Sequence, residues 1–247
     1  MKILASDFDG TIYLYGRKPQ VLPIDVAYIE NFRAEGNMFG VCTGRSLNGI
    51  IEAAPEFLHF DFYIVSSGAV IADKDRNIIY KKTIRHETAE SVYESYNKEN
   101  EIVVQAGNKV YNFSGNYPNQ VCIKFLEDIN GEDIYGISMR CSDEHKAIEI
   151  ADEINRNFGN ELSAFTNTEN VDIVSYGCSK GTAVEFVKEY FKADSIAGIG
   201  DSYNDIPMLV SADTGFTFHD SPEKVKAKVD NIVNNVAEAI CIFTERK

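Results

Sequence analysis

The first eleven residues, MKILASDFDGT, constrain the fold more than any other stretch of the chain. Ile3 to Ser6 are apolar or small, which predicts a short buried strand. The strand ends in two carboxylates, Asp7 and Asp9, and because side chains alternate along a strand we expect both on the same side. Gly10 then permits a sharp turn and a close approach between the backbone and a ligand.

Two neighbouring carboxylates repel each other, and each is driven toward its protonated form unless a cation lies between them. Mg2+ suits such a position because it prefers oxygen ligands and accepts phosphate oxygens in its coordination shell. The stretch therefore predicts a magnesium site at the end of the first strand. The alternative is an aspartate-rich turn after an edge strand, and the N-terminal residues alone do not decide between the two.

Composition and net charge limit the kinds of molecule that we expect this protein to bind. The chain has 247 residues, which is enough for one large domain or two modest ones. Apolar residues make up 44% of the chain and charged residues 25%, so a packed core is expected and disorder is not. The formal net charge of -14 argues against nucleic acid or an anionic membrane as partner, but a small anionic substrate remains compatible with local cations.

Cysteines and apolar runs indicate a cytoplasmic location. The five cysteines are scattered and form no CxxC pair, so we expect free thiols in a reducing compartment. We find no basic stretch followed by an apolar run at the N-terminus, and no apolar run approaches the ~20 residues of a membrane helix. We therefore expect a cytoplasmic protein without a membrane partner.

The two flanks of the chain alternate between strand and helix patterns. In the first flank we expect helices over 24–36 and 47–58, strands over 38–42 and 61–66, and a hairpin of 69–72 with 77–80. In the last part we expect a helix to 191, a strand over 195–199, a short helix through 209, strands over 215–218 and 231–233, and a helix over 236–243. Such alternation is typical of an α/β sheet.

The middle of the chain has a different character. Here we expect helices over 87–97 and 143–158, and strands over 102–105, 109–113, 121–126, 135–141, 162–166 and 171–175. These strands follow one another like antiparallel neighbours. The pattern predicts a Rossmann-like parallel-sheet core of residues 1–81 and 176–247, interrupted by a smaller α+β cap domain of residues 82–175.

Polar turns follow the strands of the flanks. Besides the N-terminal turn, the chain carries TGRS at 43–46, SKGT at 179–182 and GDSYND at 200–205. In a parallel sheet the carboxyl ends of the strands open onto one edge, so these turns are expected to meet there. Taken singly, the turns have ordinary alternatives: TGRS as a helix cap, Lys180 as a solvated lysine, and GDSYND as a loop of Asx turns.

DFDGT, TGR, SKG and GDSYND, in this order, resemble the motifs of the haloacid dehalogenase (HAD) superfamily of phosphohydrolases. The long insert after the second motif resembles the Cof-type branch, which includes sugar-phosphate phosphatases. Two places depart from the family pattern. Ser67-Gly68 stands where the family often has Asn-Gly, and His219-Asp220-Ser221 stands where it often has Gly-Asn-Ala. Both departures concern contacts with substrate more than the hydrolytic chemistry.

The resemblance implies a catalytic role for two residues. Asp7 matches the nucleophile that attacks phosphorus and forms an aspartyl-phosphate, and a carboxylate needs no base to activate it at neutral pH. Asp9 matches the general acid/base, which protonates the leaving oxygen and then activates water. For the metal, the resemblance implies Mg2+ held by Asp7, the backbone carbonyl of Asp9, and Asp201, with Asp205 on a metal-bound water or on Lys180.

For the phosphate group, the resemblance implies donors from all four motifs. They are the backbone amides of Phe8 and Asp9, the Thr43 hydroxyl, the Gly44 amide, Lys180 and Asn204. Lys180 would also offset negative charge on the nucleophile and the phosphoryl group.

The sequence therefore predicts a Mg2+-dependent phosphatase that acts on a small phosphorylated metabolite, most simply a sugar phosphate, as a monomer or a dimer. Two alternatives stay open: a phosphomutase of the same superfamily, and a non-catalytic sensor of a phosphorylated ligand. The four histidines show no ligand spacing, and we expect structural or surface roles for them. Tyr111, Phe113 and Tyr117 are interpreted as packing residues of the insert.

Overall fold

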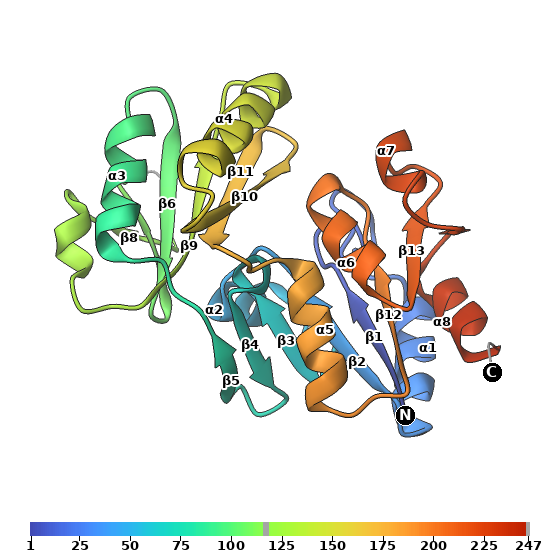
Figure 1. Cartoon of the computed structure of the whole chain (residues 1–247). Helices are drawn as coiled ribbons and strands as arrows, with labels where there is room; N and C mark the ends of the chain where they lie inside the picture. The colour runs from blue at the N-terminus through green and yellow to red at the C-terminus, as the bar shows by residue number, and fades with distance from the viewer. Residues whose placement is uncertain (116–118, 246–247) are drawn as a thin grey trace.

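The computed structural model describes residues 1–115 and 119–245, which form two β-sheets with helices (Figure 1). The larger sheet has the strand order β14-β13-β12-β1-β2-β3-β4-β5. All neighbours from β14 to β3 are parallel, and β4 and β5 add an antiparallel hairpin. The strands are β1 (Lys2–Ser6), β2 (Met38–Cys42), β3 (Phe62–Val65), β4 (Val70–Asp73), β5 (Ile78–Lys81), β12 (Ser195–Ile199), β13 (Thr214–Phe218) and β14 (Asn231–Val233).

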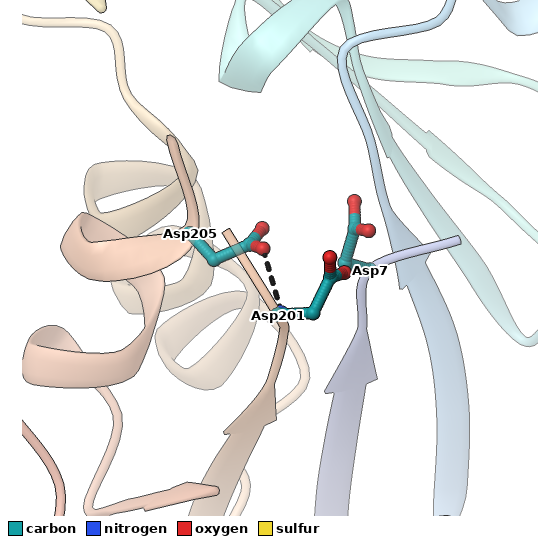
Figure 2. Close-up of side chains that lie close together, drawn as sticks. All are labelled: Asp7, Asp201 and Asp205. Carbon is teal, nitrogen blue, oxygen red and sulfur yellow. Dashed lines mark hydrogen bonds between the residues drawn. The ribbon is translucent and has the colours of Figure 1, made fainter. Parts of the chain in front are cut away.

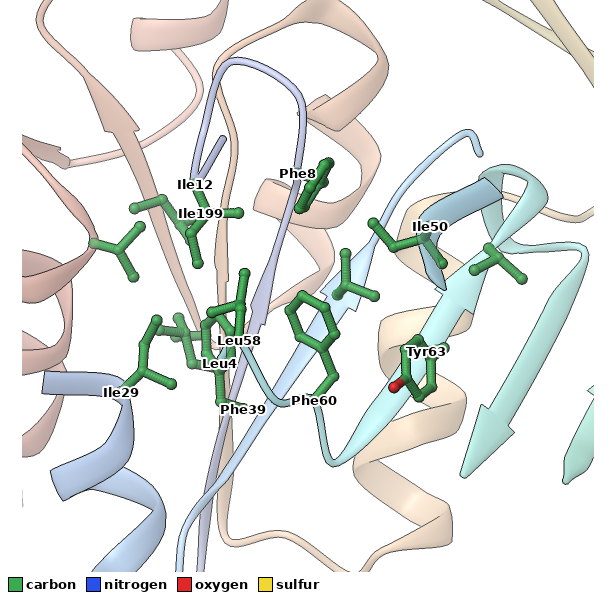
Figure 3. Close-up of a cluster of buried hydrophobic side chains, with 14 of the residues drawn as sticks. Leu4, Phe8, Ile12, Ile29, Phe39, Ile50, Leu58, Phe60, Tyr63 and Ile199 are labelled. Carbon is green, nitrogen blue, oxygen red and sulfur yellow. The ribbon is translucent and has the colours of Figure 1, made fainter. Parts of the chain in front are cut away.

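Helices cover both faces of the larger sheet. One face packs against α1 (Pro23–Ala34), α2 (Leu47–Ala53) and α8 (Val236–Glu245), and the other against α5 (Lys180–Tyr190), α6 (Ile206–Ser211) and α7 (Glu223–Lys226). The alternation of β1 explains this arrangement, because Leu4 joins the first hydrophobic cluster whereas Ile3 and Ala5 join the second. Figure 3 shows Leu4 among Phe39, Leu58 and other apolar side chains of the first cluster.

The smaller sheet has the order β10-β11-β9-β6-β7-β8 and is antiparallel except for the pair β7–β8. Its elements are α3 (His86–Tyr96), β6 (Glu101–Ala106), β7 (Lys109–Asn112), β8 (Val121–Cys122), β9 (Ile134–Arg140), α4 (Glu144–Asn157), β10 (Leu162–Asn167) and β11 (Asn170–Ser175). Both helices pack on a single hydrophobic cluster, to which Ile102 and Val104 of β6 contribute. Val103, which lies between them on β6, faces the other way. This second face of the smaller sheet lies toward the larger sheet.

The expected α/β fold with a smaller α+β insert is confirmed. The chain passes between the two sheets in adjacent segments, where the Lys82 ammonium donates a hydrogen bond of 2.6 Å to the Tyr176 carbonyl. The domain boundaries 82 and 175 stay a prediction of where the two units divide. As expected, all five cysteines are free. No helix in the described part of the chain has the length and apolar character needed to span a membrane.

Two predicted elements are wrong in their extent. The strand expected over 121–126 is only two residues long, because Asp128 accepts hydrogen bonds from the amides of Lys124 and Phe125 and turns the chain into the 3-10 helix η2 (Leu126–Ile129). The helix expected over 47–58 ends at Ala53, because the residue before Pro55 adopts an extended conformation. Tyr111 is buried and Phe113 packs on the Tyr93 ring, as expected, whereas Tyr117 lies outside the described residues.

Candidate active site

The polar turns meet at the carboxyl edge of the larger sheet, as the sequence predicts. Asp7 directly follows β1, Thr43 follows β2, and Gly200 and Asp201 follow β12, the neighbour of β1 on its other side. Lys180 is the first residue of α5, where the Ser179 hydroxyl accepts a hydrogen bond from the Thr182 amide and caps the helix.

Lys180 joins two carboxylates in the interior of the protein. Its ammonium lies 2.7 Å from Asp7 Oδ1 and 2.6 Å from Asp205 Oδ1, and only 2% of the residue is exposed. Burial acts to lower the pKa of Lys180, but the charges of Asp205 and Asp7 outweigh it and raise the pKa well above its usual value. Lys180 is therefore a permanent cation beside Asp7.

Asp205, in the turn after β12, helps to hold Lys180 in place. Its second oxygen, Oδ2, accepts a hydrogen bond of 3.0 Å from the backbone amide of Asp201 (Figure 2). It accepts another of 3.0 Å from the amide of Ser202. Both carboxylate oxygens of Asp205 are thus engaged, one by Lys180 and one by the turn. This geometry suits a residue that orients Lys180 and Asp201.

The three carboxylates of Asp7, Asp201 and Asp205 form the group that fits a metal ion. Each offers an oxygen, and these oxygens lie within 4.8 Å of one another. Burial and repulsion from Asp205 raise the pKa of Asp7 well above its usual value and that of Asp201 to about 6. A cation between them would reverse these shifts, and an all-oxygen donor set matches Mg2+. Gly10 is required here, because a Cβ at that position would lie 2.7 Å from Asp201 Oδ2.

Asp9 lines the same cavity as Asp7, but its carboxylate is not part of the group of Asp7, Asp201 and Asp205. The strand itself ends at Ser6. The Asp9 carboxylate instead accepts two hydrogen bonds from Arg45, at 2.7 and 2.8 Å, and one of 2.6 Å from the Tyr15 hydroxyl. Burial acts to raise the pKa of Asp9, but these hydrogen bonds outweigh it and lower the pKa.

Sequence reasoning missed Arg45 and Tyr15 as site residues. Arg45 is part of the TGR motif, and a cation next to a predicted phosphate-binding turn was a signal that could have found it. Tyr15 lies in an irregular loop after the first motif, where no sequence pattern marks it. The Arg45 guanidinium also lies 5.7 Å from the centre of the Phe8 ring, which places it across the base of the site.

The predicted phosphate donors lie around Asp7. Thr43 and Asn204 are buried at this edge, and the Thr43 hydroxyl accepts a hydrogen bond of 3.2 Å from the Arg45 amide. The carbonyl of Gly44 accepts a hydrogen bond of 2.9 Å from Gln105 of the smaller sheet. The Phe8 side chain packs in the core against Tyr13, so only the Phe8 backbone is available to a ligand.

A cavity of about 750 Å³ lies between the two sheets above these residues. Its floor includes Asp7, Asp9, Arg45 and Asp201, and its roof comes from the second face of the smaller sheet. Among the residues that line the roof, polar uncharged side chains predominate: Gln105, Asn119, Gln120, Ser138, Asn167, Thr168 and Asn170, with Val103, Val110 and Asp172. The site can therefore enclose a small molecule with its reacting end at Asp7.

The two departures from the family pattern lie at different places. Ser67 adopts a left-handed backbone conformation with φ of 51°, which asparagine tolerates better than serine, and its amide donates to the Thr43 carbonyl at 3.1 Å. Asp220 and Ser221 line a separate cavity of about 290 Å³ on the other side of Asp201. Ser67 thus adjoins the phosphate end of the large cavity, and Asp220 and Ser221 do not line it.

Comparison with known proteins agrees with this geometry. The family model of the haloacid dehalogenase-like hydrolases matches residues 4–241. The chain belongs to this family. The 5-amino-6-(5-phospho-D-ribitylamino)uracil phosphatase of Bacillus subtilis is 26% identical over 97% of this chain and 94% of its own length. The HMP-PP phosphatase of Klebsiella pneumoniae is 21% identical over 94% and 89% of the two chains.

Solved structures share the fold of this HAD-like hydrolase. The protein SMU.1108c of Streptococcus mutans superposes with a TM-score of 0.84 at 17% identity, over 98% of each chain. The sugar phosphatase BT4131, of HAD subclass IIB, superposes with a TM-score of 0.81 at 18% identity, over 99% of each chain. Together with the phosphatases among the sequence relatives, the family supports the expected enzyme class, a phosphoric monoester hydrolase.

Proposed function

We propose that this protein hydrolyses a small phosphomonoester with a hydroxylated leaving group, through a phosphoryl intermediate on Asp7 and with Mg2+ as cofactor. The observation that carries the proposal is the position of Asp7. It follows β1 at the edge of the sheet, lies 2.7 Å from the Lys180 ammonium, and lines the large cavity.

Asp7, Asp201 and the backbone carbonyl of Asp9 would hold the metal ion, with Asp205 as its supporting carboxylate. When bound, Mg2+ neutralises charge on the phosphoryl oxygens and on the nucleophile. Lys180 contributes in the same direction, because its charge is fixed beside Asp7. The Thr43 hydroxyl, the Gly44 amide and Asn204 would complete the set of phosphate donors.

The reaction would proceed in two displacements at phosphorus. An oxygen of Asp7 forms a bond to phosphorus while the bond to the ester oxygen breaks, and the leaving oxygen takes a proton from Asp9. A water molecule then gives its proton to Asp9 and attacks phosphorus. Inorganic phosphate leaves, and the carboxylate of Asp7 is regenerated.

Asp9 must act as an acid in the first step and as a base in the second. Its hydrogen bonds from Arg45 and Tyr15 affect both roles. The ionised form held by Arg45 and Tyr15 is the form needed to accept a proton from water. The acid step needs a protonated Asp9 that reaches the leaving oxygen, so this carboxyl group must leave Arg45 before or during substrate binding. Arg45 lines the cavity and carries a charge that a phosphorylated ligand would attract.

Support for a hydroxylated leaving group comes from the cavity and from a relative. The uncharged amide and hydroxyl groups of the roof match hydroxyl groups, which both donate and accept hydrogen bonds. The Bacillus subtilis relative is named for a substrate with a phosphorylated ribityl chain. We therefore place sugar and polyol phosphates first among the substrate classes.

Rapid-quench measurements on two variants test the proposal. Asp7→Asn should cleave no phosphoester. Asp9→Asn should form the phosphoenzyme from p-nitrophenyl phosphate at a rate close to that of the unaltered protein, because a nitrophenolate needs no proton. From a sugar phosphate, phosphoenzyme formation should slow by about 10²–10⁴-fold.

With either substrate the Asp9→Asn phosphoenzyme should accumulate, because no base remains at position 9 to take a proton from the attacking water. Equal losses of phosphoenzyme formation with the two substrates would remove Asp9 as the proton donor. A phosphoenzyme that passes its phosphoryl group to a bound sugar instead of water would identify a phosphomutase. Asp152→Asn, on the exposed face of α4, is the matched control for loss of one carboxylate.

A further inference from the structure

The smaller sheet places one buried carboxylate against the phosphate end of the cavity. Asp172 lies on β11 between Val171 and Ile173, which both pack in the hydrophobic cluster beneath α4. Because side chains alternate along a strand, Asp172 faces the opposite way, into the wall of the large cavity. Only 8% of the residue is exposed.

The contacts of Asp172 come from both sheets. Ser138, its cross-strand neighbour on β9, donates a hydrogen bond of 2.8 Å to Oδ1. Oδ2 lies against the Gly44 turn, where a Cβ at position 44 would be 3.1 Å away. The side chains of Ser67 and Asn204 also interact with the carboxyl group. Asp172 thus reaches the residues expected to bind phosphate.

Asp172 has no salt bridge in the described part of the chain. Burial raises its pKa, and the Ser138 hydrogen bond and the more distant charge of Lys180 act in the opposite direction. Aspartate is rarely buried without a charged partner, and such a residue in a cavity wall is a candidate for a functional role. In its ionised form the carboxyl group of Asp172 accepts hydrogen bonds and donates none, so the ligand group that this form selects is a donor.

A second hydrogen-bond acceptor in the same cavity also needs a donor group from a ligand. Gln120 lines the same cavity, and its Oε1 atom is buried without a hydrogen-bond partner among the described residues. Buried polar atoms of this kind are uncommon unless a ligand or water satisfies them. Ser138, which holds Asp172, lies with Asn170 and Gln120 on the same wall. The wall therefore offers one buried acceptor without a partner, Gln120 Oε1, and the carboxyl group of Asp172, which can accept further hydrogen bonds.

We propose that Asp172 is a specificity-determining residue that accepts hydrogen bonds from leaving-group hydroxyls close to the phosphoester, with Gln120 accepting from hydroxyls farther along the chain. This inference rests on the proposed function. It assigns polyol and sugar phosphates as the favoured substrate class and disfavours leaving groups with a second phosphate or a carboxylate, which the Asp172 carboxylate would repel. It also gives Gly44 a second role, because a Cβ at this position would crowd Asp172 Oδ2 at 3.1 Å.

The experiment compares substrates of equal chain length with and without hydroxyls. The value of kcat/KM is measured with ribitol 5-phosphate, n-pentyl phosphate and p-nitrophenyl phosphate. The unaltered protein should prefer ribitol 5-phosphate to n-pentyl phosphate. Asp172→Asn and Asp172→Ala should lower kcat/KM for ribitol 5-phosphate by about 10- to 100-fold, the loss expected for a hydrogen bond to a charged group. The values for the other two substrates should stay within about threefold.

Gln120→Leu provides a second variant at a partly exposed position, and it should cause a smaller loss confined to the polyol substrate. Asp152→Asn is the control for removal of a carboxylate from the same half of the molecule. An equal loss with all three substrates would overturn the proposal and make Asp172 a residue that positions the phosphate donors. No preference of the unaltered protein for the polyol, or no selective loss in the variants, would overturn it as well. Failure of the unaltered protein to hydrolyse any of the three would instead reject the proposed function.

Discussion

Arg45 holds the carboxylate of Asp9 through two parallel hydrogen bonds, from Nε to Oδ2 at 2.7 Å and from a terminal nitrogen to Oδ1 at 2.8 Å. Bidentate pairs of this kind are among the stronger ion pairs in proteins. The Tyr15 hydroxyl adds a third hydrogen bond to the same carboxylate. The expected acid/base residue is thus held in its ionised form by two side chains that belong to the cavity wall.

Tyr15→Phe should shift the pH dependence of phosphoenzyme hydrolysis. The hydrogen bond from Tyr15 lowers the pKa of Asp9, so its removal raises that pKa. Because the base form of Asp9 is needed for the water step, the acid limb of the rate should move to higher pH. We expect a small shift, since Asp9 is partly exposed and Arg45 still donates two hydrogen bonds to it. An acid limb at the same pH in Tyr15→Phe and in the control Tyr190→Phe, an exposed ring, would contradict the expectation.

Lys180→Met should destabilise the fold as well as abolish turnover. The substitution leaves Asp7 and Asp205 buried without their shared cation, and breaking a buried pair in this way typically costs about 3–5 kcal/mol. Lys188→Met is the matched control, because Lys188 makes a 2.6 Å pair with Asp213 that is partly exposed and should be worth under about 1 kcal/mol. Denaturant unfolding without metal measures both. Equal losses of unfolding free energy would show that Lys180 is not the electrostatic centre of the site.

The elements that the sequence predicted well are those with strong local patterns. The strands over 38–42, 195–199 and 231–233 have the predicted bounds. For the first two, a short apolar run between polar turns has one good solution in a buried parallel sheet. The meeting of Asp7 and Asp201 followed from the expectation that the carboxyl ends of parallel strands share one edge, and Lys180 was expected to join them from the start of its helix. Asp205 and Lys180 also pair as the resemblance implied.

What the sequence did not predict depends on loops and on contacts between the two sheets. The orientation of Asp9 is set by Arg45, which lies 36 residues away in the chain, and by a tyrosine in an irregular turn. Asp172 has no local signal, because an aspartate inside a strand of alternating pattern usually faces solvent. Its partner Gly44 belongs to the other sheet. Tertiary contacts of this kind carry no periodicity that a single sequence reveals.

Mg2+ should both restore activity after chelation and stabilise the fold. The charges of Asp7, Asp201 and Asp205 repel one another at this site, and a bound cation relieves the repulsion. A ligand present at 100 times its Kd adds about 2.7 kcal/mol to the free energy of unfolding. We therefore expect Mg2+ to raise the Tm of the unaltered protein, and Asp201→Asn to remove most of that increase.

The rise of Tm that Mg2+ causes should also be smaller at low pH. The pKa of Asp201 is raised to about 6 without a bound cation, so protons compete with Mg2+ as the pH falls through that value. Thermal unfolding at pH 7.5 and pH 5.0, each with and without Mg2+, measures the competition. Full activity in metal-free buffer would contradict the assignment of Mg2+, and an equal rise of Tm in Asp201→Asn would place the metal elsewhere.

Asp25 should make the stability of the fold depend on pH, independently of the active site. It is 2% exposed, and its carboxylate accepts a hydrogen bond of 2.8 Å from the Ala237 amide at the start of α8. Burial raises its pKa from 3.8 to about 6. The folded state therefore binds more protons than the unfolded state between these values, and the free energy of unfolding falls as pH rises through this window.

A shift of this size corresponds to about 3 kcal/mol in full, most of which is lost between pH 4 and pH 7. Asp25→Asn keeps the size of the side chain and an acceptor for the Ala237 amide, but it does not ionise. The variant should gain stability relative to the unaltered protein as the pH is raised from 4 to 7. Denaturant unfolding of both proteins across this range measures the difference, with Asp75→Asn, an exposed acid of the β4–β5 turn, as the control. A constant difference in the free energy of unfolding between the two proteins would show that Asp25 is ionised in the folded state throughout, because the amide of Ala237 then compensates for its burial.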